Sequence, residues 1–323
     1  MLHTLSLRSL LLAAAAALAV VSAQAQTVIG IANLGPHPSI AKTIDGFKAE
    51  MARLGHAEGG NTAYVYSDAN FTQALMPQMF TQITSQKPRL ILTVTTSVSQ
   101  VAQATVDKSI PIVFAMVTDP VKAGLVPGWD KGGARSTGAS DMQDFDAVLA
   151  FGKKLFPHAR RFGVLYNPGE VNDMVSTQML QGAASKAGLE FRPVSVDAVG
   201  DIPQRAELLR GVDFLYVTGS NLVQSAIPAV AASMNRLGIP ILSNETEFVK
   251  TGLASANYAV SLQSIGANAA RLADQVLKGK TTVQLPAARP GPQDYVTTIN
   301  RGRFKALGLA IPPAFDACDC FIN

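Results

Sequence analysis

One pattern of short apolar runs and amphipathic stretches occurs twice along this chain, in the same order. Three pairs of segments carry the repetition: residues 28–33 and 161–167, 88–95 and 212–218, and 110–113 and 239–242. Within each pair the segments are offset by about 125 to 135 residues, and a nearly constant offset is what a duplicated domain requires. The sequence therefore predicts two domains with a common plan.

Each half alternates strand-like and helix-like segments. The strand-like runs are continuously apolar (28–32, 90–94, 112–115, 162–166 and 214–218), and the stretches between them have helical periodicity (40–54, 74–85 and 175–187). Continuous apolar strands separated by helices are typical of parallel sheets buried on both faces. Because such crossovers are right-handed, we expect an α/β protein of two similar, doubly wound, Rossmann-like lobes.

The first 25 residues have the features of an export signal. Arg8 precedes the apolar run 10–21, and the small residues Ala23 and Ala25 follow it, so we expect cleavage near Ala25 and Gln26. The apolar run is too short to span a membrane, which needs about 20 residues. No cysteine lies near the cleavage point to carry a lipid.

Polar side chains gather where the predicted strands end. In open parallel sheets ligands bind at these carboxyl ends, and backbone N–H groups at the following helix starts attract anions. The candidate ligand-binding residues of this kind are His37, Ser39, Thr95, Thr96, Ser97, Thr118, Asp119, Asn167, Asn172, Ser220, Asn221, Asn244 and Glu245. The alternative for each hydroxyl, amide and carboxylate is a helix N-cap, and for His37 an ordinary loop residue.

The sequence shows no recognisable catalytic, cofactor or metal motif. Residues 218–221 lack the second glycine of a nucleophile elbow, and the glycine pairs at 59–60 and 132–133 match no nucleotide-binding loop. The histidines are scattered, and the formal charge of +4 is not collected in a basic run. We therefore expect no enzyme activity, cofactor, metal or nucleic-acid partner. Cys318 and Cys320 allow a tight disulfide, an intermolecular bond or two free thiols.

Several motifs resemble one family. They are residues 37–39, 118–126, 137–141, 163–167, 252–255, 265–279, 299–300 and 306–312. Together they make the chain similar to the periplasmic substrate-binding proteins of ATP-binding-cassette (ABC) importers with the type I fold. Within that family the chain resembles the branch that includes tryptophan- and phenylalanine-binding proteins. The resemblance implies a periplasmic monomer that closes around a small molecule and delivers it to a permease in the inner membrane.

The resemblance also implies a hinge of three segments, with crossings near Asp141, Asn257 and Leu285. Lobe 1 would comprise residues 26–141 and 258–284, and lobe 2 residues 142–257 and 285–323, with the ligand cleft between them. For an amino-acid ligand, Thr96 and Ser97 would meet the carboxylate. The ammonium would need Asp141, Asn221 or Glu245. Tyr166 and Asn257 complete the expected site.

Three alternatives remain at this point. The protein could present its ligand to a membrane sensor instead of a permease, or its ligand could be a sugar or a nucleoside. The third alternative is an exported hydrolase or isomerase that uses carboxylates such as Asp119, Asp141 and Glu245.

Overall fold

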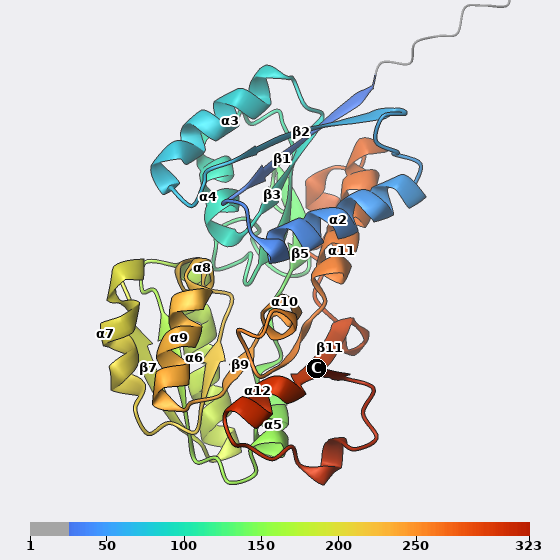
Figure 1. Cartoon of the computed structure of the whole chain (residues 1–323). Helices are drawn as coiled ribbons and strands as arrows, with labels where there is room; N and C mark the ends of the chain where they lie inside the picture. Colours follow the sequence, from blue (N-terminus) through green and yellow to red (C-terminus); the bar gives the residue numbers. More distant parts are fainter. Residues whose placement is uncertain (1–25) are drawn as a thin grey trace, which may run out of the picture.

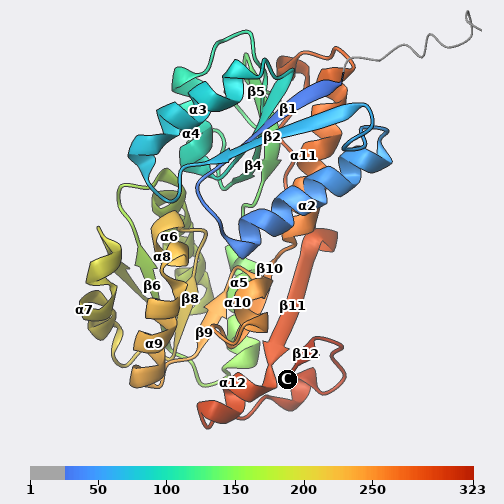
Figure 2. The ribbon, with the colours of Figure 1, turned by 45° about the horizontal axis from the view of Figure 1, so that its top comes forward.

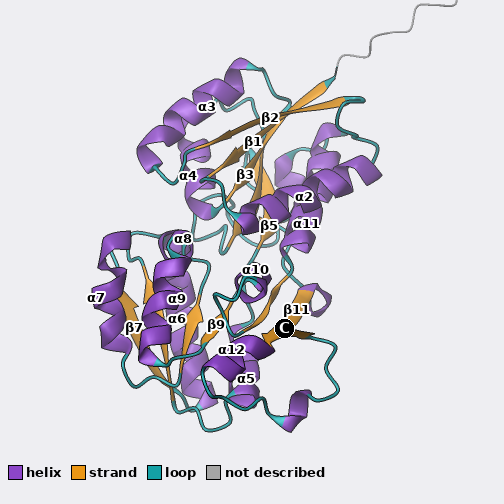
Figure 3. Ribbon diagram, viewed as in Figure 1, coloured by secondary structure: helices purple, strands orange, loops and turns teal. Residues whose placement is uncertain are grey.

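The computed structural model describes residues 26–323, so the predicted signal segment lies outside the described residues. Two α/β lobes are stacked on each other, and the chain passes between them several times (Figure 1). Each lobe is one sheet with helices on both faces (Figure 3). The predicted fold class, two doubly wound lobes, is confirmed.

The first lobe has a five-stranded, wholly parallel sheet in the order β2-β1-β3-β4-β5. Its strands are β1 (Thr27–Asn33), β2 (Thr62–Asp68), β3 (Leu90–Val94), β4 (Ile112–Val117) and β5 (Ser136–Ser140). Its helices are α2 (Pro38–Arg53), α3 (Met76–Ser85), α4 (Thr96–Thr105) and α11 (Leu262–Leu277). Every residue of β3 and β4 is buried, as expected for central strands covered on both faces.

The second lobe has a seven-stranded sheet in the order β12-β11-β10-β9-β8-β6-β7. The strands are β6 (Arg161–Tyr166), β7 (Glu190–Ser195), β8 (Phe214–Val217), β9 (Ile241–Ser243), β10 (Ala256–Val260), β11 (Tyr295–Asn300) and β12 (Phe321–Ile322). The helices are α5 (Phe145–Leu155), α6 (Val171–Ala187), α7 (Ile202–Ala206), α8 (Asn221–Ser225), α9 (Ile227–Leu237), α10 (Thr246–Lys250) and α12 (Arg301–Ala306). The pairing of β10 with β11 is antiparallel, which departs from the wholly parallel plan expected.

Helix α11 comes late in the sequence but packs beside α2 in the first lobe, and Figure 2 shows the two helices side by side. Glycines make this packing close. A side chain at Gly46 would collide with the backbone of Gln263, and one at Gly266 would collide with the backbone of Thr43. Since the two helix backbones nearly touch, neither position accepts a larger residue without moving a helix.

The chain changes lobes a few residues later than predicted at two crossings. Asn257 lies inside β10, and β10 pairs in the second sheet through Val260. Leu285 is still attached to the first lobe, because its carbonyl accepts a hydrogen bond of 2.8 Å from the Thr137 hydroxyl. Ala288 donates its N–H to Gly138 in the same lobe. We therefore place these crossings after Val260 and after Ala288.

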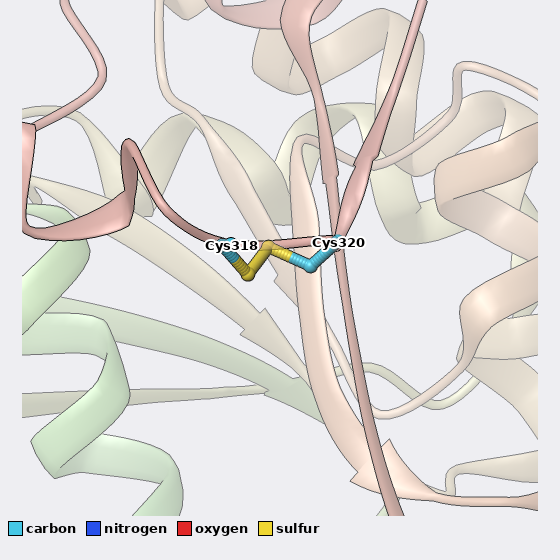
Figure 4. Close-up of a disulfide and its surroundings, with 2 residues drawn as sticks. All are labelled: Cys318 and Cys320. Atoms are coloured by element: carbon cyan, nitrogen blue, oxygen red, sulfur yellow. A yellow bond between two sulfur atoms is a disulfide. The ribbon is translucent and has the colours of Figure 1, made fainter.

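A disulfide joins Cys318 to Cys320 beside the last strand (Figure 4). The Ile299 N–H donates to the Cys320 carbonyl at 2.8 Å, and β12 then pairs in parallel with β11. The sequence allowed a tight disulfide, an intermolecular bond or two free thiols, and the structure contains the tight disulfide. Within residues 26–323, no helix has the length and apolar character needed to cross a membrane.

Candidate functional site

The two lobes touch directly at the start of α2. The Ser39 hydroxyl donates a hydrogen bond to the Glu245 carboxylate of the other lobe, and both residues are buried. The His37 ring meets the Phe248 ring edge-on, with 5.6 Å between ring centroids. Proline at the first position of α2 and the His37 ring nitrogen, which accepts from the Ser39 N–H at 3.3 Å, fix this helix start. The lobes therefore stand in a closed arrangement.

A cavity between the lobes is lined by residues from both sides. The lining residues of the first lobe are Leu34, His37, Ile40, Phe71, Thr95, Thr96 and Met116. Those of the second lobe are Gly219, Asn221, Gln224 and Ser225, and Asp141, at the first crossing, completes the lining. Five predicted residues meet here: His37, Thr95, Thr96, Asp141 and Asn221. The cavity volume is 20 Å³, close to the space that one water needs. A larger ligand therefore enters only when the lobes part and lining side chains move.

Backbone strain is concentrated in the walls of this cavity. Phe71, Thr95 and Met116 have φ values of +58°, +85° and +55°, in the left-handed region that side-chain-bearing residues rarely adopt. All three line the cavity. Such conformations cost about 1–3 kcal/mol each and persist where the surrounding structure imposes them, often at ligand sites.

Two neighbouring carboxyl groups lie at the interlobe contact: Asp141, which lines the cavity, and Glu245, which accepts from Ser39. Asp141 Oδ1 and Glu245 Oε1 are buried and have no hydrogen-bond partner among the residues that the structure describes. Burial raises the pKa of the Asp141 carboxyl to about 6, against the opposing effect of the Thr118 hydroxyl. Burial and then the charge of Asp141 raise the pKa of Glu245 to about 8. The pair therefore lacks a cationic partner within the described chain.

The cavity lining also contains the start of helix α4. Thr95 precedes the helix and Thr96 is its first residue, with no acidic side chain in the first turn. The first N–H groups of a helix have no partner within the helix, and the helix dipole adds positive potential there. Ser97 lies in the same turn, and its hydroxyl is 3.4 Å from that of Thr95. This part of the lining is suited to a carboxylate.

Glu170, which the sequence analysis did not single out, organises the second lobe's side of the site. Its carboxylate accepts from the Asn221 N–H at 2.8 Å, the Asn221 side chain at 2.9 Å and the Leu222 N–H at 2.9 Å. It also accepts from the Asn172 amide at 3.1 Å. Asn172 and Asn221 are thus held in place by Glu170 and serve to position the start of α8. An acidic residue in a polar loop gives no sequence signal for this role.

Asp173 supports the neighbouring loop in a similar way. Its carboxylate accepts from the Asn167 N–H at 2.7 Å and from the Thr218 hydroxyl at 3.1 Å. Burial, and then the charge of Glu170, raise the pKa of Asp173 to about 7. Asn167 is therefore part of the scaffold below the cleft.

The remaining predicted residues lie around the cavity or away from it. Ser220 caps α8, and Asn244 lies against Gln224 and Gly219. Asn257 is buried and donates to Thr246 and to the Val296 carbonyl. Thr118 lies beside Asp141. Asp119 and Tyr166 line two other cavities, so the structure does not bring them to the interlobe cavity.

Sequence reasoning missed the apolar wall of the cavity, formed by Leu34, Ile40, Phe71 and Met116. Ile40 and Met116 lie within a helix and a strand and have the pattern of ordinary core residues. Phe71 was detectable in principle, because it is a large aromatic residue in a polar loop after a strand, where no core is expected.

The fold and the cleft define a two-lobed binding protein that closes around a small molecule. Residues 28–316 match the family model described as ABC transporter substrate binding protein. The chain belongs to this family of non-catalytic substrate-binding components, so the predictions of an ABC binding protein and of no enzyme activity are confirmed.

A curated relative is the tyrosine-binding protein of Clostridioides difficile (strain R20291). It is 32% identical over 285 residues, which cover 88% of this chain and 81% of that protein. Among solved structures, the chain is similar to an ABC domain in complex with L-Trp from Streptococcus pneumonia. The identity is 24% and the TM-score 0.85, over 92% of this chain and 100% of the other.

A second solved structure is the ligand-free, open form of a substrate-binding protein with adhesive properties from Clostridium difficile. Its identity is higher, 29%, but its TM-score is lower, 0.70, over 92% of this chain and 99% of the other.

Proposed function

We propose that this protein binds tyrosine or a similar aromatic amino acid between its lobes and delivers it to an ABC permease in the inner membrane. One observation carries the proposal. The interlobe cavity brings together Asp141, whose Oδ1 is buried and has no partner in the described chain, the start of helix α4 and apolar side chains of the first lobe. This arrangement is complementary to an α-amino acid with an apolar side chain.

The ammonium end of the ligand would meet Asp141, with Glu245 close by. A desolvated ammonium needs acceptors, and a charge-assisted bond to a carboxylate is the strongest kind available. Asp141 Oδ1 and Glu245 Oε1 are both without partners in the described chain, so each has the capacity to accept. Burial raises the pKa values of both groups, and a bound ammonium would offset this by favouring their ionised forms.

The carboxylate end would meet the first turn of α4, where Thr95 and Thr96 line the cavity. The side chain would lie against Phe71, Leu34, Ile40 and Met116, which offer an apolar and aromatic surface. The names of the relatives support an aromatic ligand, since one is a tyrosine-binding protein and another holds L-Trp. A sugar or nucleoside ligand would leave the carboxylate pair without a cation.

The proposal includes export to the periplasm and action as a monomer. Residues 1–25, with their apolar run and small residues before Gln26, support export. The family supports a permease as the partner. Fractionation of cells that express the full chain, with mass determination of the product, tests export. The expected product is periplasmic and begins near Gln26, and a full-length cytoplasmic product would contradict export.

Calorimetric titration with matched ligands tests the binding role. Tyrosine should bind, while tyramine, which lacks the carboxylate, and 3-(4-hydroxyphenyl)propanoate, which lacks the ammonium, should each bind at least about tenfold more weakly. Ribose serves as a control that should not bind. Equal affinities for tyrosine and both analogues would refute the two-ended site, and ribose binding in place of tyrosine would refute the ligand class.

A further inference from the structure

A second cavity lies beside the hinge and has a volume of 440 Å³. Its walls include residues 142–144 of the first crossing and 289–292 of the third crossing, together with residues of both lobes. It shares none of its lining residues with the interlobe cavity. The volume is within the range of about 300–1,000 Å³ that small-molecule sites occupy.

Three aromatic rings line this hinge cavity. Trp129 comes from the first lobe, and the Arg289 guanidinium lies over its ring at 3.9 Å from the centroid. Tyr258 and Tyr295 come from the second lobe and stack on each other, with centroids 4.9 Å apart. Aromatic faces carry negative potential; Arg289 lies over the Trp129 ring, and the stacked Tyr258 and Tyr295 supply further aromatic surface.

The charged groups of the lining are Asp119, Asp144 and Arg289, so carboxylates outnumber cations. Neither aspartate forms a salt bridge within residues 26–323. Each uses Oδ1 to accept from backbone N–H groups of the turn or helix that follows it. Gln143 is 7% exposed, and its Oε1 has no partner in the described part of the chain. The lining therefore favours a donor with positive charge.

We propose that the hinge cavity is a second ligand site, which binds a small organic ammonium with an aromatic or apolar body. The carboxylates of Asp119 and Asp144 supply the charge complement, and the tyrosine and tryptophan rings hold the body. Because residues of both lobes line the site in the closed arrangement, an occupant stabilises closure and raises the affinity of the cleft for its own ligand.

One hydrogen bond connects this site to the cleft, and a second holds the same crossing within the site. Gln143 Nε2 donates to the Asp141 carbonyl at 2.9 Å, and Asp141 carries the carboxylate that lies in the cleft. The Asp144 N–H donates to the Tyr295 hydroxyl at 2.6 Å, which ties the same crossing to the start of β11. A ligand against Gln143 and Tyr295 therefore acts on the segment that positions Asp141.

Fluorescence of Trp129 tests the site directly, because the chain contains one tryptophan. Titration of the full protein with 2-phenylethylamine, with excitation at 295 nm, should give a saturable change in emission. Phenylacetate, which has the same ring and the opposite charge, should bind at least about tenfold more weakly. A flat response to the amine, or equal responses to both compounds, would overturn the proposed site.

Variants separate this site from the cleft. The double variant Asp119→Asn/Asp144→Asn keeps the backbone caps but removes the charge, and it should weaken the amine response at least about tenfold. Asp197→Asn, an exposed carboxylate of the second lobe, is the matched control and should respond as the unaltered protein does. The response should persist in Asp141→Asn. Its loss there, or its survival in the double variant, would assign the amine to the cleft and overturn the proposal.

The coupling is measured by titrating tyrosine with and without saturating 2-phenylethylamine. Tyrosine affinity should rise at least about fivefold with the amine. An unchanged or lower affinity would overturn the coupling, even if Trp129 responds. The coupling rests on the proposed function, whereas the fluorescence response does not. If tyrosine fails to bind in both conditions, the proposed cleft ligand is wrong, and the Trp129 response still decides the hinge site.

Discussion

The Ser39 hydroxyl of the first lobe donates a hydrogen bond to the Glu245 carboxylate of the second lobe, and both side chains are buried at the contact. Ser39 lies in the first turn of α2, and Glu245 directly precedes α10. This bond exists only when the lobes are closed. It therefore stabilises the closed arrangement next to Asp141 and Glu245, the carboxyl groups proposed to bind the ligand ammonium.

Replacing Ser39 by alanine should weaken ligand binding without destabilising either lobe. A hydrogen bond to a carboxylate contributes about 1.5–3 kcal/mol, and this one is lost only from the closed state. Tyrosine affinity measured by calorimetry should therefore fall about tenfold or more, while the melting temperature of the unliganded protein stays unchanged. Ser85→Ala, on an exposed helix end, is the control. An unaltered affinity would show that the contact does not stabilise closure.

Asp141→Asn should weaken binding of tyrosine at least about thirtyfold, which corresponds to roughly 2 kcal/mol. Asp141 does not cap the helix that starts at Phe145, because the cap is Asp144, whose carboxylate accepts from the Ala147 N–H at 3.0 Å. Loss of Asp141 should therefore not lower the unliganded melting temperature. Asp146→Asn, on the surface of the same helix, should retain affinity. Retained affinity in Asp141→Asn would remove this residue from the ligand site.

Affinity should decrease below pH 6. The ligand ammonium favours the ionised form of Asp141, and the pKa of this carboxyl in the unliganded protein is raised by burial to about 6. Binding below that pH must expel a proton, so affinity falls by about tenfold for each pH unit. Burial lowers the pKa of His37, which also lines the cavity. Calorimetry from pH 4.5 to 7 measures the effect. The profile should be less steep in Asp141→Asn, because only the Glu245 carboxyl, whose pKa burial raises to about 8, remains to titrate beside the ammonium. A flat profile in the unaltered protein contradicts the account.

Glu170→Ala should destabilise the second lobe. The substitution leaves two backbone N–H groups at the start of α8 and two side-chain amides without their acceptor. Each unsatisfied buried donor costs about 1–3 kcal/mol, so the free energy of unfolding should fall by at least about 2 kcal/mol. Denaturant titration followed by circular dichroism measures this. Glu190→Ala removes an exposed carboxylate paired with Arg192 and should cost under about 1 kcal/mol. Equal losses in the two variants would mean that Glu170 is not a structural anchor.

The plan of the fold could be predicted because it is repeated in the chain. Apolar runs such as Leu90–Val94 and their counterparts specify parallel strands covered on both faces, and two copies specify two lobes. The exact crossings could not be predicted. Residues after Asn257 still pair in the second lobe, and Leu285 is still bonded to the first lobe. Such pairing depends on residues far apart in the sequence, so no local pattern predicts where it ends.

The candidate site was predictable only in part. Polar residues at strand ends identified His37, Thr96 and Asn221, because strand ends of parallel sheets meet at one edge. The same rule misplaced Asp119, whose carboxylate is held by the turn at Val121 and Lys122 and lines the hinge cavity instead. Glu170 and the apolar wall were missed, since their roles depend on side chains that come together only in the folded chain.

Small-angle scattering with and without tyrosine tests the central claim, that the lobes close around an aromatic amino acid, most directly. Closure as a rigid-body movement about the crossings brings the loops at 37–39 and 167–172 together. The account predicts a smaller radius of gyration at saturating tyrosine than without ligand, and no such change with ribose. Superimposable scattering curves at saturating tyrosine would contradict it.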